Sequence, residues 1–276
     1  MPAPPSVTGM TPTLARRAGA VTLIAVTAAA LAGCGGGIGA RLTYDDTEKV
    51  KVSEIVLTGG SGDVTVTTAA IADTRIKRIV RSNGSDDPRA SYELTGTVLT
   101  LDTNCGPHCQ VSYEIQAPTG VAVRGKLGSG DLTLSDIGSA DVTVGSGGAA
   151  VDRASGAVSL KAGSGDILAN DLLGETTLVT GSGDVEARGL SGGKAVRAQT
   201  GSGDVTVEVT QVASVTARTG SGNIELMVPD GAYQVKTRTG SGDAELLGVV
   251  NDATAKNVIE VQTGSGDATI TAIPGS

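Results

Sequence analysis

Residues 213–228 read Ala-Ser-Val-Thr-Ala-Arg-Thr-Gly-Ser-Gly-Asn-Ile-Glu-Leu-Met-Val, and this stretch decides the fold. Apolar or small residues occupy the odd positions from Val215 to Thr219 and the even positions from Ile224 to Val228. Alternation with a period of two indicates strands with one buried face. The buried face changes from odd to even numbers across Gly220–Asn223, so the chain must turn a sharp corner there. Glycine suits such a corner because it lacks a Cβ atom.

The corner recurs along most of the chain. Gly-Ser-Gly-Asp occurs seven times, starting at Gly60, Gly128, Gly163, Gly181, Gly201, Gly240 and Gly264. Gly145–Gly148 and Gly220–Asn223 are close variants, and from Gly128 onward the corners are 17 to 24 residues apart. Self-similarity at this period predicts a solenoid, whose coils must stack because one coil cannot bury its own apolar face. We expect an all-β fold: a single-chain β-solenoid, or β-helix, of coils about 18–20 residues long with Gly-Ser-Gly-Asp corners.

A threonine stands directly before many of the corners. These residues are Thr180, Thr200, Thr219, Thr239 and Thr263. They occupy inward positions of the alternation, so we expect a ladder of stacked hydroxyl groups just inside the turns. The opposite end of each coil varies in length and composition, and insertions of that kind in solenoids often lie on a binding face.

The composition limits the classes of partner. The chain has 276 residues, 41 of them glycine, and a formal net charge of −8. It has four tyrosines but neither phenylalanine nor tryptophan, so an aromatic core and a platform for stacking bases are excluded. An acidic chain also lacks the basic footprint of nucleic-acid binding and disfavours anionic partners. We therefore expect no nucleic-acid partner.

The aspartates of the corners form the most prominent candidate site. They are Asp63, Asp131, Asp166, Asp184, Asp204, Asp243 and Asp267. In stacked coils they would lie about 4.8 Å apart and repel one another. We expect each to be a structural turn residue that accepts backbone N–H bonds within its own turn, with Lys161, Arg218 and Arg238 reducing the repulsion. The alternative is a calcium-binding, metal-stabilised rod, although Gly148 and Asn223 interrupt the row.

No pattern in the sequence predicts an active site. A serine of Gly-Ser-Gly would need a base, and the one histidine, His108, lies in a loop far from the corners. A polysaccharide-active β-helix enzyme is a second alternative, but it would need clustered acids and sugar-stacking aromatics, and the tyrosines are dispersed. We assign no catalytic residue, no metal and no cofactor.

The start of the chain has the features of a secretory targeting signal. Arg16-Arg17 precede an apolar run at Ala18–Ala30, which is shorter than the roughly 20 residues of a membrane-spanning helix. Leu31-Ala32-Gly33-Cys34 then resembles the bacterial lipobox, in which the chain is cleaved before the cysteine and the thiol is acylated. We predict a lipoprotein signal peptide at residues 1–33. An ordinary signal peptide with an incidental cysteine is the alternative, and translation could start at Met1 or Met10.

The remaining organisation follows from these landmarks. We expect a Gly-rich tether at 34–41, an irregular β region at 42–120 that leads into and caps the stack, and regular repeats at 121–276. Cys105 and Cys109 are spaced for a disulfide across a hairpin loop in an oxidising compartment. The alternative, a metal site that also uses His108, lacks a fourth ligand nearby.

Recurrent Thr-Gly-Ser-Gly-Asp followed by alternating aliphatic residues, behind a lipobox, resembles the bacterial "putative adhesin" domain family of unknown function. The resemblance covers about residues 50–272 and includes Val228–Tyr233 ahead of the corner at Gly240. It implies a β-solenoid at the cell envelope and no catalytic residues. We predict a non-catalytic lipoprotein, held by its lipid on the extracytoplasmic face of a bacterial cell membrane, that serves in binding, adhesion, scaffolding or stress sensing with an unidentified envelope or surface component.

Overall fold

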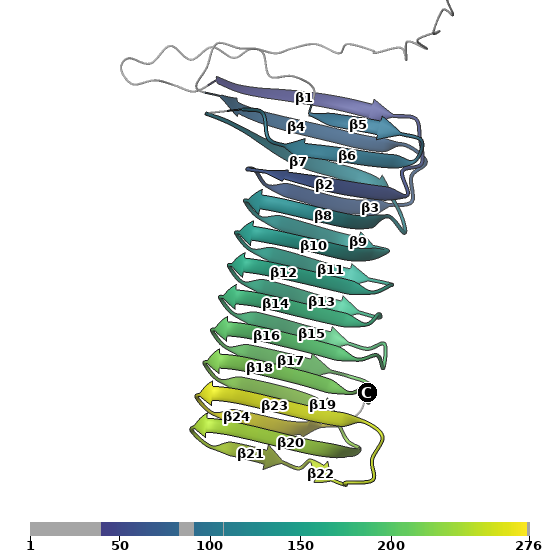
Figure 1. The fold of residues 1–276 in the computed structure, drawn as a ribbon. Coiled ribbons are helices and arrows are strands. Elements are labelled where there is room, and N and C mark those ends of the chain that lie inside the picture. The colour runs from purple at the N-terminus through teal and green to yellow at the C-terminus, as the bar shows by residue number, and fades with distance from the viewer. Residues whose placement is uncertain (1–39, 83–90, 107, 275–276) are drawn as a thin grey trace, which may run out of the picture. The chain divides into compact units, whose positions relative to one another are not determined.

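The computed structural model describes residues 40–82, 91–106 and 108–274. Contacts divide the chain into two units, Met1–Gly35 and Gly36–Ser276, and all the described residues lie in the second. Their regular structure consists of 24 strands in two sheets of 12, which confirms the all-β prediction (Figure 1). Among these residues no helix is long and apolar enough to cross a membrane. The predicted signal peptide and Cys34 lie outside the described residues.

The two sheets are named A and B. Sheet A runs, in spatial order, β1 (Ala40–Glu48), β4 (Thr74–Ser82), β7 (Cys109–Pro118), β3 (Val64–Ala69), β9 (Leu132–Ile137), β11 (Ala149–Ala154), β13 (Ile167–Leu172), β15 (Val185–Leu190), β17 (Val205–Val209), β19 (Ile224–Pro229), β24 (Ala268–Ile273) and β21 (Ala244–Leu247). Sheet B runs β5 (Tyr92–Thr95), β6 (Val98–Thr103), β2 (Glu54–Gly60), β8 (Ala122–Ser129), β10 (Ser139–Ser146), β12 (Val158–Ser164), β14 (Thr176–Ser182), β16 (Val196–Ser202), β18 (Val215–Ser221), β23 (Val258–Ser265), β20 (Ala232–Ser241) and β22 (Val250–Asn251).

Each coil consists of a strand in sheet B, a glycine corner and a strand in sheet A. Neighbouring coils pair in parallel and in register, which confirms the solenoid. The register places the corners in single file along one edge of the stack. Their second residues follow one another as Ser61, Ser129, Ser146, Ser164, Ser182, Ser202, Ser221, Ser265 and Ser241.

The core is a thin aliphatic layer between the two sheets. Inward columns such as Val196, Val215 and Ile259 are almost completely buried, as the period-two pattern predicts. The threonine ladder also forms. Thr180, Thr200, Thr219 and Thr263 are buried, and their hydroxyls donate to the corner carbonyls of Gly165, Gly183, Gly203 and Gly222 in the adjacent coil at 2.8–2.9 Å. Thr239 differs, because it donates to Gly242 of its own corner at 3.0 Å.

The first coil of the stack is separated in sequence from the second. The coil β2–β3, with the corner at Gly60, pairs directly with β8 and β9. The 68-residue gap between the corners at Gly60 and Gly128 is an excursion to the outer side of this coil, where β6 and β7 join the two sheets. Antiparallel strands β4, β1 and β5 then complete that end.

The last coil does not lie at the end of the stack. We expected successive coils to be neighbours, but β23–β24 inserts between β18–β19 and β20–β21 (Figure 1). The outermost coil is therefore β20–β21, and the chain returns from it into the stack. The 24-residue interval between the corners at Gly240 and Gly264 is the longest of the regular repeats and supplies the connection that makes this return possible.

Candidate functional site

The corner aspartates form a hydrogen-bonded ladder along one edge of the stack. Except for Asp243 in the outermost coil, the side-chain Oδ1 of each corner aspartate, and of Asn223, accepts a bond from the backbone N–H of the equivalent residue in the next coil. The bonds run from Asp131 to Asp63 (3.1 Å), Gly148 to Asp131 (2.8 Å), Asp184 to Asp166 (2.9 Å), Asp204 to Asp184 (2.8 Å), Asn223 to Asp204 (2.7 Å), Asp267 to Asn223 (3.0 Å) and Asp243 to Asp267 (2.9 Å). We expected these side chains to accept N–H bonds within their own turns, but the bonds join neighbouring turns instead. The reason is that the backbone N–H of the fourth residue of each corner points along the stack, toward the carboxylate of the adjacent coil. Through these bonds the corner side chains link adjacent coils.

The ladder has one gap, at Gly148. This glycine has no side chain to offer the amide of Asp166, whereas Asn223 shows that an asparagine can take the position. A Cβ atom at Gly148 would meet Asp131 Oδ1 at 3.6 Å and the Asp166 carbonyl oxygen at 3.7 Å, which is ordinary contact.

Gly148→Asn is therefore expected to stabilise the protein. The new side-chain oxygen should accept the Asp166 N–H and raise the free energy of unfolding by about 1 kcal/mol relative to Gly148→Ala, which adds a Cβ but no acceptor. Thermal unfolding should show a melting temperature about 2–4 °C higher for the asparagine variant than for the alanine variant. Equal melting temperatures would mean that the ladder bond contributes nothing.

The ladder occupies one oxygen of each bonded carboxylate, which accepts an amide N–H. The described part of the chain contains no group of three or more His, Cys, Asp or Glu side chains that could hold a metal ion. Cys105 and Cys109 are joined in a disulfide with their Cα atoms 5.4 Å apart, so their sulfurs are not available as metal ligands.

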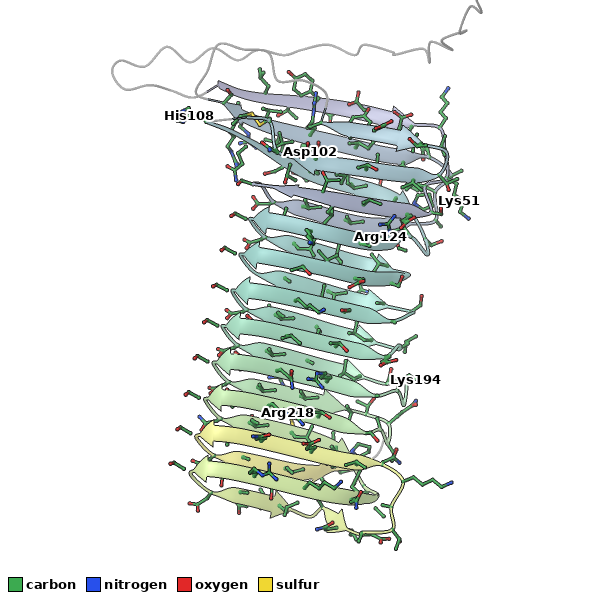
Figure 2. The ribbon with its side chains drawn as sticks, viewed as in Figure 1. Lys51, Asp102, His108, Arg124, Lys194 and Arg218 are labelled. Atoms are coloured by element: carbon green, nitrogen blue, oxygen red, sulfur yellow. A yellow bond between two sulfur atoms is a disulfide. The ribbon has the colours of Figure 1, made fainter. Side chains whose placement is uncertain are left out.

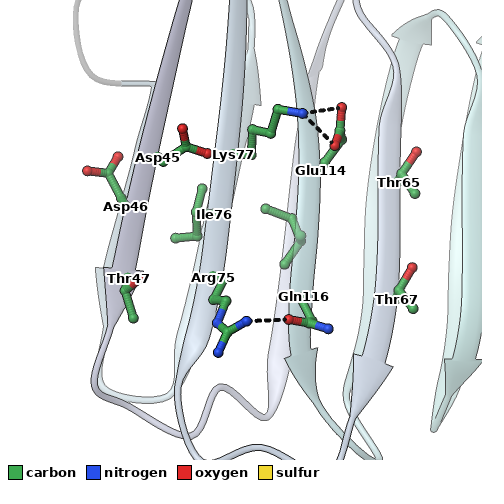
Figure 3. Close-up of a pocket in the computed structure, with 11 residues that line it drawn as sticks. Asp45, Asp46, Thr47, Thr65, Thr67, Arg75, Ile76, Lys77, Glu114 and Gln116 are labelled. Carbon is green, nitrogen blue, oxygen red and sulfur yellow. Dashed lines mark hydrogen bonds and ion pairs between the residues drawn. The ribbon is translucent and has the colours of Figure 1, made fainter. Parts of the chain in front are cut away.

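Ionisable groups gather in a shallow groove on the outer face of sheet A, across β1, β4, β7 and β3 (Figure 3). Lys77 Nζ lies 3.0 Å from Glu114 Oε2, and Arg75 Nη1 donates to Gln116 Oε1 at 3.3 Å. The Lys77 and Glu114 side chains are 42% and 52% exposed. These are cross-strand pairs on a solvated sheet, so we assign no acid–base chemistry to them.

The edge opposite the corners carries a shorter ladder of a different kind. Asp136, Arg153 and Asp171 occupy equivalent positions in successive coils, and each has a positive φ of 55–60°. Arg153 Nε donates to Asp136 Oδ1 at 2.7 Å, and this bond lowers the pKa of the Asp136 carboxyl. Because the Arg153 and Asp136 side chains are 53% and 42% exposed to solvent, the effect of the network on stability is small.

The charged residues separate by face, which is the most informative feature of the stack. In the strands of sheet B from β8 to β20, seven residues are basic and two are acidic: Arg124, Lys126, Lys161, Arg197, Arg218, Lys236 and Arg238 against Asp141 and Glu260. In the facing strands of sheet A, from β9 to β21, seven are acidic and two are basic: Asp136, Asp152, Asp171, Glu186, Glu208, Glu225 and Glu245 against Arg153 and Arg188.

These two sets of strands therefore carry opposite net charges, +5 from β8 to β20 of sheet B and −5 from β9 to β21 of sheet A, from seven minus two in each case. Figure 2 labels two of the basic residues, Arg124 on β8 and Arg218 on β18. Net charge led us to disfavour anionic partners, but the net charge of the chain averages over two sets of strands that differ in sign. The signal was present in the sequence, because outward residues before each corner tend to be basic and those after it acidic.

One family model and several solved structures are similar to this chain. The family model Toastrack DUF4097 matches residues 26–271. Among solved structures, a "putative cell adhesion protein" from Clostridium sporogenes is 14% identical, with 84% of this chain and 100% of that chain covered and a TM-score of 0.28. A "putative adhesin" from Bacteroides fragilis is 15% identical (84% and 97% covered, TM-score 0.42), and one from Parabacteroides merdae is 11% identical (86% and 98%, TM-score 0.30). No curated protein matches the chain.

Proposed function

The chain belongs to the Toastrack DUF4097 family, an adhesin-like domain of unknown function, and from this premise we propose that it is a non-catalytic binding rod of the bacterial cell envelope. The separation of charge between its two faces carries the proposal. An enzyme concentrates its reactive groups in one pocket, whereas here the polar groups repeat from coil to coil. A flat repeated surface suits adhesion or scaffolding through many weak contacts.

We propose the outer face of sheet B as the binding surface and an anionic polymer or surface of the envelope as its partner. Coils stack about 4.8 Å apart, so the basic side chains form a closely spaced array. Two of them have partners within the rod, since Arg218 Nη2 lies 2.6 Å from Glu260 Oε1 and Arg124 pairs with Glu54. Lys126, Lys161 and Arg197 are exposed and form no ion pair within the described part of the chain. Attraction of this kind is multivalent and weakens with salt.

The binding face can be tested with two triple variants that lower the net charge by the same amount, one on sheet B and one on sheet A. Lys126→Gln, Lys161→Gln and Arg197→Gln together remove three positive charges from sheet B. Combined, they are expected to weaken binding to immobilised dextran sulfate at least about tenfold at 50 mM salt. The matched control also lowers the net charge by three, but it places the change on sheet A.

That control is Thr133→Glu, Thr206→Glu and Thr269→Glu, whose parent threonines lie on β9, β17 and β24. It should bind nearly as well as the parent protein. Equal losses in the two triple variants would show that binding follows net charge and not the face. No measurable binding by the parent protein at low salt would remove the proposed partner class.

We propose that Cys34 is acylated and anchors the rod on the extracytoplasmic face of the cell membrane. The support is its position after an apolar run and small residues. Several acyl chains on one residue hold a protein on a bilayer stably, because each buried CH₂ contributes about 0.8 kcal/mol. Cys34→Ser is expected to leave the precursor uncleaved or to release the protein, as seen by membrane fractionation and intact mass. A serine variant that is still cleaved and still sediments with membranes would contradict the anchor.

A further inference from the structure

The C-terminal end of the stack is incompletely covered. Strand β21 pairs only with β24, and β20 pairs with β23 along its length and with β22 only at Ala232 and Tyr233. From β21 in sheet A the chain passes to β22, which pairs with the start of β20, so β22 covers β20 at the end remote from the corner. On the corner side, backbone ladder groups of both strands face outward along the stack. Open strand edges of this kind are templates for further pairing.

Apolar side chains are exposed at this end, one of them at a position that the other coils bury. Leu246 aligns with Ile270 of the adjacent coil, and the exposed fractions are 41% and 0%. Leu247 and Val250 are 42% and 62% exposed. These three account for half of the six exposed large hydrophobic residues of the described chain. Leu246 is thus a core position left uncovered, and Leu247, which aligns with outward Thr271, and Val250 add exposed apolar surface beside it.

The charge of the outermost coil indicates what covers it. Residues 232–257 contain three basic and three acidic residues: Lys236, Arg238 and Lys256 against Asp243, Glu245 and Asp252. This coil is neutral, whereas the whole chain carries −8. A strongly charged partner gains nothing there, but two copies of the same end can approach without net repulsion. We propose that the C-terminal ends of two copies pair about a two-fold axis, which goes beyond the binding function of sheet B.

Charge also selects the direction of that axis. An axis perpendicular to the sheets would place β20 against β20 of the second copy and bring the outward Lys236 and Arg238 side chains near their like-charged equivalents. An axis along the strands places β21 against β20 of the second copy, antiparallel, at both sheets. In that arrangement outward Glu245 faces outward basic residues, so opposite charges meet.

The symmetry fixes the register as well. Rotation about an axis along the strands leaves each residue's position along the strands unchanged, so residues equally far from the corner become neighbours. Arg238 stands two residues before Gly240, and Glu245 stands two residues after Asp243. Arg238 should therefore lie beside Glu245 of the second copy, and the pair should occur twice in one closed interface.

Cysteine cross-linking in intact membranes tests the contact with the full chain. Differently tagged Arg238→Cys and Glu245→Cys chains are co-expressed, oxidised with copper phenanthroline and separated on a non-reducing gel. The mixed pair is expected to give a disulfide-linked dimer in at least tenfold higher yield than a pair of Glu208→Cys chains, which carry the cysteine in the middle of the stack. Dimer from Arg238→Cys alone would establish the other axis, and equal yield from the Glu208→Cys pair, or no dimer at all, would overturn the interface.

A charge exchange tests the same pair without cysteine. Arg238→Glu and Glu245→Arg are each expected to reduce co-purification of two differently tagged full-length copies at least tenfold, and the double variant should restore it. Leu246→Glu should also abolish co-purification. Unchanged circular dichroism separates loss of pairing from loss of folding, and copies that co-purify equally well in all variants would contradict the proposal.

Discussion

Gly165→Ala is expected to destabilise the stack by about 3 kcal/mol or more, although it adds a single methyl group. Gly165 is the third residue of its corner and has a φ of +123°, which residues with a Cβ atom rarely adopt. A Cβ atom there would lie 2.2 Å from the carbonyl oxygen of Gly147 in the adjacent coil. Neither backbone can retreat easily, because Gly165 N–H donates to Ser182 O at 2.8 Å and Gly147 N–H donates to Ser164 O at 3.0 Å.

The control for this substitution lies one residue beyond Gly147. Gly148→Ala makes the same chemical change where φ is ordinary and space is open, so it should leave stability unchanged or raise it by up to about 1 kcal/mol. Denaturant unfolding of both variants measures the difference. If Gly165→Ala were as stable as Gly148→Ala, close approach of the corner backbones could not be the reason for glycine at the third position.

A stop codon after Asn257 is expected to release the whole outermost coil in addition to the residues it removes. The truncation deletes β23 and β24, and these strands are what join β20 and β21 to the rest of the stack. Residues 232–257 would then lose the strands with which they pair, and the only sheet edges left for them would be those of β18 and β19, which they do not contact in the complete chain. Hydrogen exchange should show protection of the β20 amides falling at least about 100-fold, while β10 and β12 keep theirs.

An internal deletion provides the matched control. Removing residues 232–256 takes out the outermost coil and leaves β23–β24 able to pair with β18 and β19. Protection of β18 should persist in this variant and fall in the truncated one. If β20 stayed protected after the truncation, that would contradict the prediction that β20 and β21 depend on β23 and β24 for their place in the stack.

Local pattern was sufficient to predict the coils. Alternation around Gly220–Asn223 specifies two strands and a corner, and inward Thr219 predicts the hydroxyl ladder, because both depend on residues close in sequence. The sequence pattern could not predict the order in which the last two coils stack. The coils at Gly240 and Gly264 present nearly the same inward residues, so either could pack on β18, and the choice depends on the long connection and on packing of the complete chain.

The site was harder to predict for two physical reasons. The Asp184 carboxylate has backbone amides both in its own turn and in the next coil within reach, and only the three-dimensional direction of the amide of Asp204 decides between them. The opposite charges of the two sheets did not show in the sequence analysis, because the net charge of the whole chain averages over both. Assigning Lys161 and Glu186 to outward positions on either side of their corners would have separated the two signs.

The inserted last coil has a mechanical consequence. A force on β1 acts on a strand with one neighbour, β4, so that end can be peeled away one row of hydrogen bonds at a time. A force on β24 acts on a strand held between β19 and β21, so the coil must be sheared from both sides at once. The molecule should resist pulling at its C-terminal strand more strongly than at its first strand.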